Sequence, residues 1–188
     1  IVFLENYRVS LAERIFPASD LSEQISTAGT EASGTGNMKF MLNGALTIGT
    51  YDGANIEMAE CAGMDNIFIF GLRANEVEEM KRRGYSPSEC IRRCESLGRI
   101  VDLIAGNFFS SYQPGLFDPI VNVLTQHDPY LICADFESYL KAQDRVDKVF
   151  ADKAEWARRS IHNVASAGFF SSDRTIREYA RDIWKVPC

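Results

Sequence analysis

The fold is decided by the stretch Thr30-Glu31-Ala32-Ser33-Gly34-Thr35-Gly36-Asn37-Met38-Lys39-Phe40. Its first half consists mostly of small residues, and its second half opens a segment, residues 37–42, that favours a helix. Asn43-Gly44 ends that helix, and the apolar residues 45–50 predict a buried strand. A small-residue loop, a helix and a buried strand in this order are typical of one unit of a parallel α/β sheet.

The same alternation extends to both sides of this stretch. Short apolar runs predict strands, and amphipathic runs predict helices. The predicted strands are residues 2–7, 45–50 and 67–70, with 20–26 ambiguous, and the predicted helices are residues 9–16, 37–42, 54–61 and 75–83. Residues 1–85 are therefore expected to form an α/β, Rossmann-like parallel sheet with crossover helices. Residues 86–188 are expected to be mainly helical and packed on that sheet.

The predicted C-terminal helices follow from hydrophobic spacing. Residues 87–106 and 117–126 favour helices, and an aromatic-rich loop lies between them. Apolar residues then recur at helical intervals from Phe136 and again from Trp156 and Ile176, with Ser171 or Ser172 as an N-cap for the last helix. The chain opens with Ile1-Val2-Phe3-Leu4, which predicts a buried strand that needs neighbours on both sides. We therefore expect this chain to be a piece of a longer protein.

Composition narrows the classes of function. The net charge of −6 argues against a broad nucleic-acid footprint, and no run approaches the roughly 18 apolar residues of a membrane span. We find no signal-peptide pattern. The chain has an odd number of scattered cysteines, namely Cys61, Cys90, Cys94, Cys133 and Cys188. These features favour reduced thiols, no metal site and a soluble protein of the cytoplasm.

The small residues before the helix suit a phosphate group, because the first amides of a helix are unpaired and carry partial positive charge. Neither the P-loop nor the dinucleotide-binding motif is met, since Thr35 and Lys39 stand where those motifs need lysine and glycine. Lys39 follows Gly36 by one turn, among Met38, Phe40, Met41 and Leu42, which predicts a largely apolar pocket. A neutral amine there can condense with the aldehyde of pyridoxal phosphate. The alternatives are an ordinary tight turn at Gly34-Thr35-Gly36 and a surface or ion-paired Lys39.

The stretch from Thr30 to Thr50 resembles the cofactor-attachment segment of the α-glucan (glycogen/starch) phosphorylases. The similarity extends to residues 2–10, 20–26, 52–57 and 171–180, is dense over residues 2–71, and is looser over residues 75–158. The resemblance implies the end of the C-terminal domain in a two-domain GT-B glycosyltransferase architecture, with the N-terminal domain lying outside this chain. It also implies an enzyme that uses pyridoxal 5′-phosphate, α-1,4-glucan and inorganic phosphate, and that forms a homodimer at full length.

The resemblance assigns roles to individual residues. Lys39 would carry the cofactor as an imine, and the 5′-phosphate would be held by Arg8, the amides of Thr35 and Gly36, and Tyr7. The glucosyl pocket would be lined by Glu31, Ala32, Ser33 and Gly34. In the implied reaction the cofactor phosphate exchanges a proton with inorganic phosphate, which attacks C1 of the departing glucose and gives glucose 1-phosphate with retention. The 188 residues alone would be inactive.

Two other functions remain open from the residues. One is a nucleotide-sugar glycosyltransferase of the same two-domain architecture, which needs no imine at Lys39. The other is a non-enzymatic glucan-binding or interaction module. The basic run Lys81-Arg82-Arg83 is typical of a solvated helix face.

Overall fold

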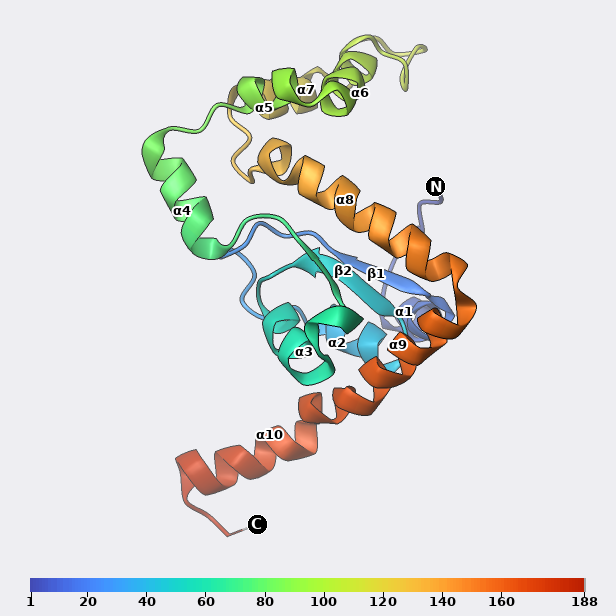
Figure 1. Cartoon of the computed structure of the whole chain (residues 1–188), viewed down its shortest axis with the longest axis vertical. Coiled ribbons are helices and arrows are strands. Elements are labelled where there is room, and N and C mark those ends of the chain that lie inside the picture. Colours follow the sequence, from blue (N-terminus) through green and yellow to red (C-terminus); the bar gives the residue numbers. More distant parts are fainter. Residues whose placement is uncertain (188) are drawn as a thin grey trace.

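A parallel sheet lies at the centre of the chain (Figure 1). The structure, a computed structural model, describes residues 1–187. Within them the sheet has three strands in the order β1-β2-β3, with bounds β1 Leu21–Gln24, β2 Leu46–Thr50 and β3 Phe68–Phe70. Leu21 pairs with Leu46, and Ile48 pairs with Phe68. The predicted parallel α/β class is confirmed, and the ambiguous segment 20–26 contains a strand.

Helices make the two crossovers that parallel strands require. The strands β1 and β2 are joined by α2 (Thr35–Leu42), and β2 and β3 by α3 (Ala54–Ala62) and a 3₁₀ turn, η2 (Met64–Asn66). All five residues of β2 are buried, as expected for a central strand covered on both faces. The helices predicted over residues 37–42 and 54–61 are confirmed to within two residues.

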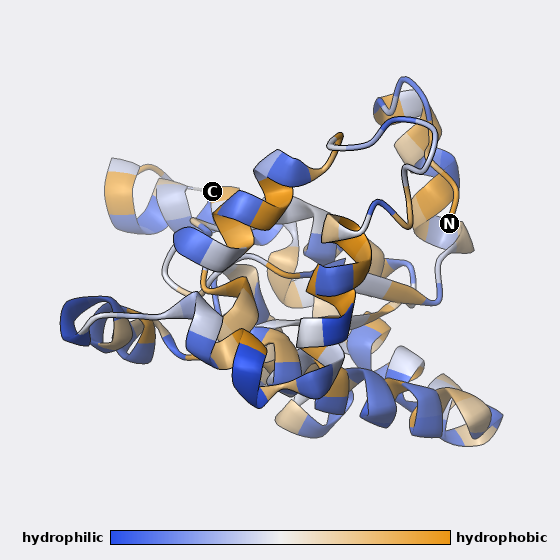
Figure 2. Ribbon diagram, turned by 90° about the horizontal axis from the view of Figure 1, so that it is seen from above, coloured by the Kyte–Doolittle hydropathy of each residue, from blue (hydrophilic) through white to orange (hydrophobic). Residues whose placement is uncertain are grey.

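Each face of the sheet has its own core. The long helix α8 (Ile132–Ala151) crosses one face, and α2 and α3 lie on the other (Figure 1). Helix α9 (Lys153–Ser166) begins on the α8 side, where Trp156 packs, and continues along α2 and α3. The α8 side contains Leu46, Ile48, Phe68, Phe70, Ala142, Val146 and Trp156. The opposite side contains Met41, Met58, Ala59, Ala62, Ile67 and Ala167. Figure 2 shows hydrophobic and hydrophilic residues alternating along most helices, which is typical of helices that bury one face only.

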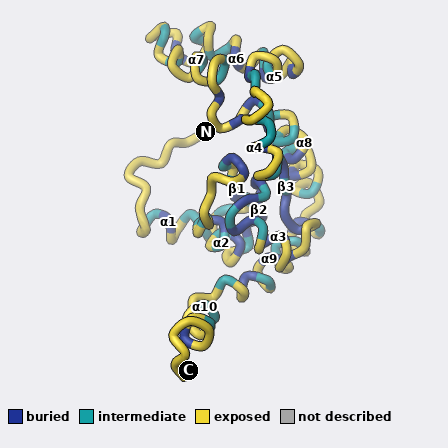
Figure 3. Tube along the Cα trace, turned by 90° about the vertical axis from the view of Figure 1, so that its left-hand side faces the viewer, coloured by how far each residue is buried: buried dark blue, intermediate teal, exposed yellow. Residues whose placement is uncertain are grey.

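The remaining helices lie farther from the sheet. They are α4 (Ala74–Arg83), α5 (Pro87–Arg93), α6 (Glu95–Ala105), α7 (Asp118–Gln126), α10 (Ser172–Glu178) and the terminal π-helix η4 (Tyr179–Trp184), and η3 (Ala167–Phe170) joins α9 to α10. Helices α5 to α7 gather at one end around a small core that they share with the start of α8, and α10 extends from the other end (Figures 1 and 3). The segment 87–106 is two helices, because Cys94 takes an extended conformation between them. Ser171 precedes α10 without donating or accepting a side-chain capping bond.

The strand predicted over residues 2–7 is wrong. These residues form no strand and are exposed, and the exposed fractions of Val2 and Phe3 are 82% and 89%. A strand exists only where a neighbouring strand supplies its hydrogen bonds, and none of the described residues does so here. The next predicted helix is confirmed as α1 (Val9–Ile15), which continues into the 3₁₀ turn η1 (Phe16–Ala18) at Pro17.

The four described cysteines are all free thiols, and Cys188 lies outside the described residues. Among residues 1–187, no helix is both long and apolar enough to cross a bilayer.

Candidate functional site

A cavity of about 700 Å³ lies between α1, η1 and the C-terminal half of α2. Three of the predicted site residues, Tyr7, Arg8 and Lys39, line it together. The other lining residues are Val9, Ala12, Glu13, Phe16, Pro17, Leu42 and Asn43. Its shape depends on an edge-to-face contact between Phe16 and Phe40, whose ring centroids are 4.5 Å apart. This contact attaches η1 to α2 and so brings the segment that carries Arg8 beside the helix that carries Lys39.

The surroundings of Lys39 are largely apolar but more open than its sequence neighbours suggest. Lys39 is exposed, and its Nζ lies 5.9 Å from the centroid of the Phe16 ring. Of the four apolar neighbours, Leu42 lines the cavity, whereas Met41 is fully buried in the core on another face of α2. Residues adjacent in sequence point to different sides of a helix, so an apolar run around a lysine does not enclose it. The cavity wall is largely apolar, as predicted, but Val9, Ala12, Phe16 and Pro17 supply more of it than the sequence neighbours of Lys39 do.

The N-terminus of α2 presents free space and uncapped amides. Gly34 precedes the helix with a φ of 85°, and no side chain within residues 1–187 caps this end. A Cβ at Gly36 would meet no other atom within 4 Å. Thr35 and Gly36 lie four and three residues before Lys39, so all three share one helix face. They do not line the cavity itself, but they lie one turn from Lys39 along α2.

The segment Glu31-Ala32-Ser33-Gly34 lies apart from this cavity, at the carboxyl ends of the strands. Asp52, which follows β2 and is 9% exposed, holds its start in place. One carboxylate oxygen of Asp52 accepts hydrogen bonds from the backbone N–H groups of Thr30, at 3.1 Å, and Glu31, at 2.8 Å. The Glu31 carboxylate itself stays exposed. It is therefore available to a ligand.

The end of the same loop is attached to the start of α3. The carbonyl of Ser33 accepts a hydrogen bond of 2.5 Å from the N–H of Ala54. Gly53 makes this approach possible, because its φ is 48° and a Cβ there would lie 2.5 Å from the Ser33 oxygen. Any other residue at this position would push the loop away from α3.

Buried amides tie the two crossover helices to the central strand. Asn37 of α2 donates to the Oδ1 of Asn55 in α3 at 2.7 Å, and Asn55 donates to the carbonyl of Thr50 at 2.9 Å. Gly49 leaves room for Asn55, since a Cβ there would lie 2.6 Å from its side-chain nitrogen. Both helices that border the candidate site are therefore held at fixed positions relative to β2.

Sequence reasoning missed three contributors to this region. Asp52 was named only within the similar segment 52–57, because its contact with residues 30 and 31 spans more than twenty positions. Asn37 and Asn55 gave no local signal either. On the α8 side, Asp135 lines a separate cavity of about 400 Å³, and burial is the largest cause that raises the pKa of its carboxyl group. An aspartate two residues after a buried strand, as at Asp52, is the one feature that could have been noticed in advance.

Comparison with known proteins gives a consistent result over almost the whole chain. A family profile described as carbohydrate phosphorylase matches residues 1–186. The chain is 59% identical over 186 residues to the muscle form of glycogen phosphorylase from Mus musculus, which covers 99% of this chain and 22% of that relative. It is 59% identical over 184 residues to the brain form from Bos taurus, with 98% and 22% covered. The human muscle form is 58% identical. The chain thus spans about a fifth of the length of these relatives, and it belongs to the carbohydrate phosphorylase family.

Proposed function

We propose that this chain is the cofactor-bearing portion of an α-1,4-glucan phosphorylase. The observation that supports this most is that Lys39 lines one cavity with Arg8 and Tyr7, although more than thirty residues separate them in sequence. One amine, one guanidinium and one phenol around a space of about 700 Å³ suit a small molecule with an aldehyde and a phosphate. The family membership supports the same assignment.

The residues present fit pyridoxal 5′-phosphate. Lys39 is the attachment residue. Arg8 and Tyr7 donate hydrogen bonds to the phosphate, and the uncapped amides at Thr35 and Gly36 add partial positive charge on the same helix face. Open space beside Gly36 leaves room for a bulky group. When bound, the cofactor supplies a phosphate with a second pKa of about 6, which suits proton exchange near neutral pH.

The loop Glu31-Ala32-Ser33-Gly34 is assigned to the terminal glucosyl unit. Glu31 accepts hydrogen bonds from sugar hydroxyls, while Asp52 and the Ser33–Ala54 contact keep the loop backbone in place. A loop held at both ends loses less conformational freedom when a sugar binds. Asp52 acts through the loop and is a positioning residue.

The complete reaction needs the rest of the protein. Because this chain spans about 22% of its relatives, we assign it to the end of the C-terminal domain of a GT-B enzyme. That enzyme releases glucose 1-phosphate from glycogen, starch or maltodextrin with inorganic phosphate. It acts as a homodimer in the cytoplasm, without a nucleic-acid or membrane partner. These 188 residues alone are expected to show no phosphorolysis.

The test is borohydride reduction of the full-length parent followed by peptide mapping. We expect the reduced cofactor on the peptide that contains Lys39, and no label on that peptide in Lys39→Arg. Lys81 of α4 is the internal control, since it is a lysine on a helix outside the cavity. Label at any other lysine, or a parent that shows no pyridoxal absorbance after reconstitution, would overturn the proposal. The second result would favour a nucleotide-sugar transferase.

A further inference from the structure

A third cavity, of about 360 Å³, lies along the outer edge of β3, far in sequence from Lys39. Its walls come from η2, β3, α8 and α9. The apolar lining residues are Met64, Ile67, Phe68, Ile69 and Val149, and the charged ones are Asp65, Arg145, Lys148 and Arg159. The volume falls near the lower end of the roughly 300–1,000 Å³ range of small-molecule sites. None of these residues takes part in the proposed phosphorolysis.

The cavity is locally positive in an acidic chain. The protein carries a net charge of −6, yet three cations and one carboxylate line this space, which gives a local charge of +2. Arg145 and Lys148 lie one turn apart on α8, and Arg159 faces them from α9. Cations gathered from two helices around an apolar wall favour an anionic ligand with an apolar or sugar-like body.

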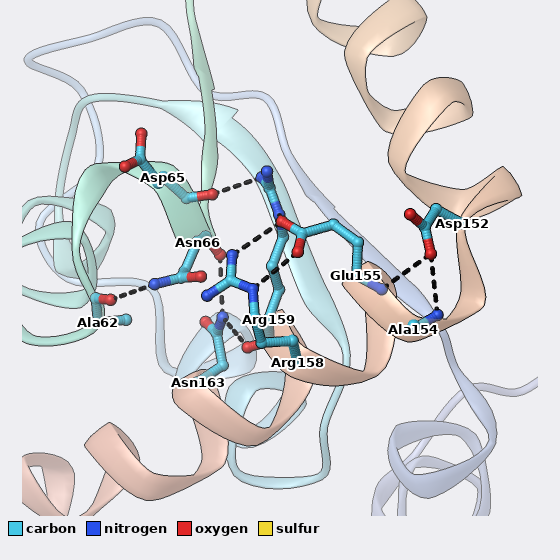
Figure 4. Close-up of polar contacts among 9 residues, drawn as sticks. All are labelled: Ala62, Asp65, Asn66, Asp152, Ala154, Glu155, Arg158, Arg159 and Asn163. Atoms are coloured by element: carbon cyan, nitrogen blue, oxygen red, sulfur yellow. Dashed lines mark hydrogen bonds and ion pairs between the residues drawn. The ribbon is translucent and has the colours of Figure 1, made fainter.

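Arg145 and Arg159 are held in place by hydrogen bonds, and each has N–H groups that make no hydrogen bond within residues 1–187. The Nη2 of Arg145 donates to the carbonyl of Ile69 at 2.8 Å. Arg159 donates from Nη1 to the carbonyl of Asp65 and from Nε to Glu155 (Figure 4). Among residues 1–187 the structure gives no partner to the Nη2 of Arg159, the Nε and Nη1 of Arg145, or the Nζ of Lys148. Preorganised cations with unused N–H groups lose little freedom when they bind an oxyanion.

The adjacent Glu155 does not cancel this charge. Glu155 accepts hydrogen bonds from both Arg158 and Arg159, and these lower the pKa of its carboxyl group to about 2. Arg158 makes two of these bonds and does not line the cavity. Glu155 is therefore balanced by Arg158, and the side chain of Arg159, only 18% exposed, stays available at the cavity wall.

We propose that this cavity is a second binding site, for a small molecule that carries a phosphate group. Arg145, Lys148 and Arg159 bind the phosphate oxygens, and the Phe68–Ile69–Val149 wall contacts the rest of the molecule. Asp65 disfavours ligands with a further negative charge near η2. The site stands independently of the proposed phosphorolysis.

The test is equilibrium dialysis of the full-length holoenzyme with radiolabelled inorganic phosphate at fixed ionic strength. The double variant Lys148→Ala/Arg159→Met is expected to lose one phosphate per subunit, since it removes two charge-assisted contacts. Lys148→Ala alone removes an exposed lysine and is expected to weaken that site by about tenfold without affecting the fold. The matched control is Lys141→Ala, which removes a lysine from the same helix, α8, at a position that does not line the cavity, and which should retain full binding.

Phosphorolysis is measured in parallel to separate this site from the proposed catalytic one. We expect unchanged activity in all three variants. The same stoichiometry and affinity in the wild type and the double variant would refute the site. A loss in Lys141→Ala equal to that in Lys148→Ala would refute it too, because it would show an effect of overall charge.

Discussion

The hydrogen bonds of Asp52 allow a quantitative prediction about the proposed glucosyl loop, residues 31–34. One of its carboxylate oxygens accepts two backbone N–H groups, from Thr30 and Glu31. Asp52→Asn keeps the shape and removes the charge. A hydrogen bond to a charged group contributes about 1.5–3 kcal/mol, and a neutral one about 0.5–1.5 kcal/mol. The substitution therefore costs about 1 kcal/mol per bond, or about 2 kcal/mol in total.

This loss corresponds to a specific kinetic change. If the bonds serve to hold the loop, 2 kcal/mol lowers kcat/KM for the glucan by about thirtyfold in the full-length enzyme. Hydrogen exchange at the amides of Thr30 and Glu31 should accelerate by a similar factor, which reports the loop directly. The matched control is Asp182→Asn, the same chemical change at an exposed acid paired with Arg181. A kcat/KM within twofold of wild type in Asp52→Asn, with unchanged amide exchange, would refute the role of Asp52.

The contacts described lead to three further predictions. Gly53→Ala should lower the free energy of unfolding by roughly 2 kcal/mol in thermal denaturation, because a Cβ there meets the Ser33 carbonyl at 2.5 Å. Gly168→Ala is the control, since nothing lies within 4 Å of a Cβ there, and equal effects of the two changes would contradict the clash. Burial, and after it the charge of Asp128, raises the pKa of the Cys133 thiol from 9.0 to about 12. The thiol form is therefore favoured in the folded state, and its contribution to stability is full below pH 9 and lost as the pH rises from about 9 to 12. Denaturant midpoints should fall over that range, and they should fall less in Cys133→Ala. Arg158 and Arg159 lower the pKa of the Glu155 carboxyl group from 4.5 to about 2. Its contribution to stability is therefore full above pH 4.5 and lost as the pH falls towards 2. A carboxyl NMR titration should show this midpoint, and Arg158→Met should move it upward; an unmoved midpoint would contradict the assignment.

The regular part of the fold could be predicted because its signals are local. The buried run of β2, the Asn43-Gly44 end of α2 and the small residues before α2 each act within a few positions. The prediction of a strand over residues 2–7 failed because a strand depends on a partner strand, which hydrophobicity alone does not identify and which can be distant in sequence. The break at Cys94 also went unnoticed, because the apolar spacing continues across it.

In the candidate site, too, local signals could be predicted and distant contacts could not. Lys39 and the small-residue loop stood out by local chemistry, and Arg8 and Tyr7 were named only through the family resemblance. The structure then brings Tyr7, Arg8 and Lys39 to one cavity. Asp52 and the Asn37–Asn55 pair were missed, because a buried polar residue shows its purpose only when its distant partner is known. The exposure of Lys39 was left as an alternative, since the composition around a residue does not show which way its helix face points.

The bond between Arg145 and the Ile69 carbonyl also bears on self-association. A free strand edge is a template on which a second molecule can extend the sheet, and proteins often protect it with a charged side chain. On β3 a guanidinium already occupies an edge acceptor, so an incoming chain would have to displace it. In the described residues β1 pairs with β2 alone. Aggregation of the isolated polypeptide should therefore start at β1, and a proline or lysine placed in β1 should suppress it more effectively than the same change in β3.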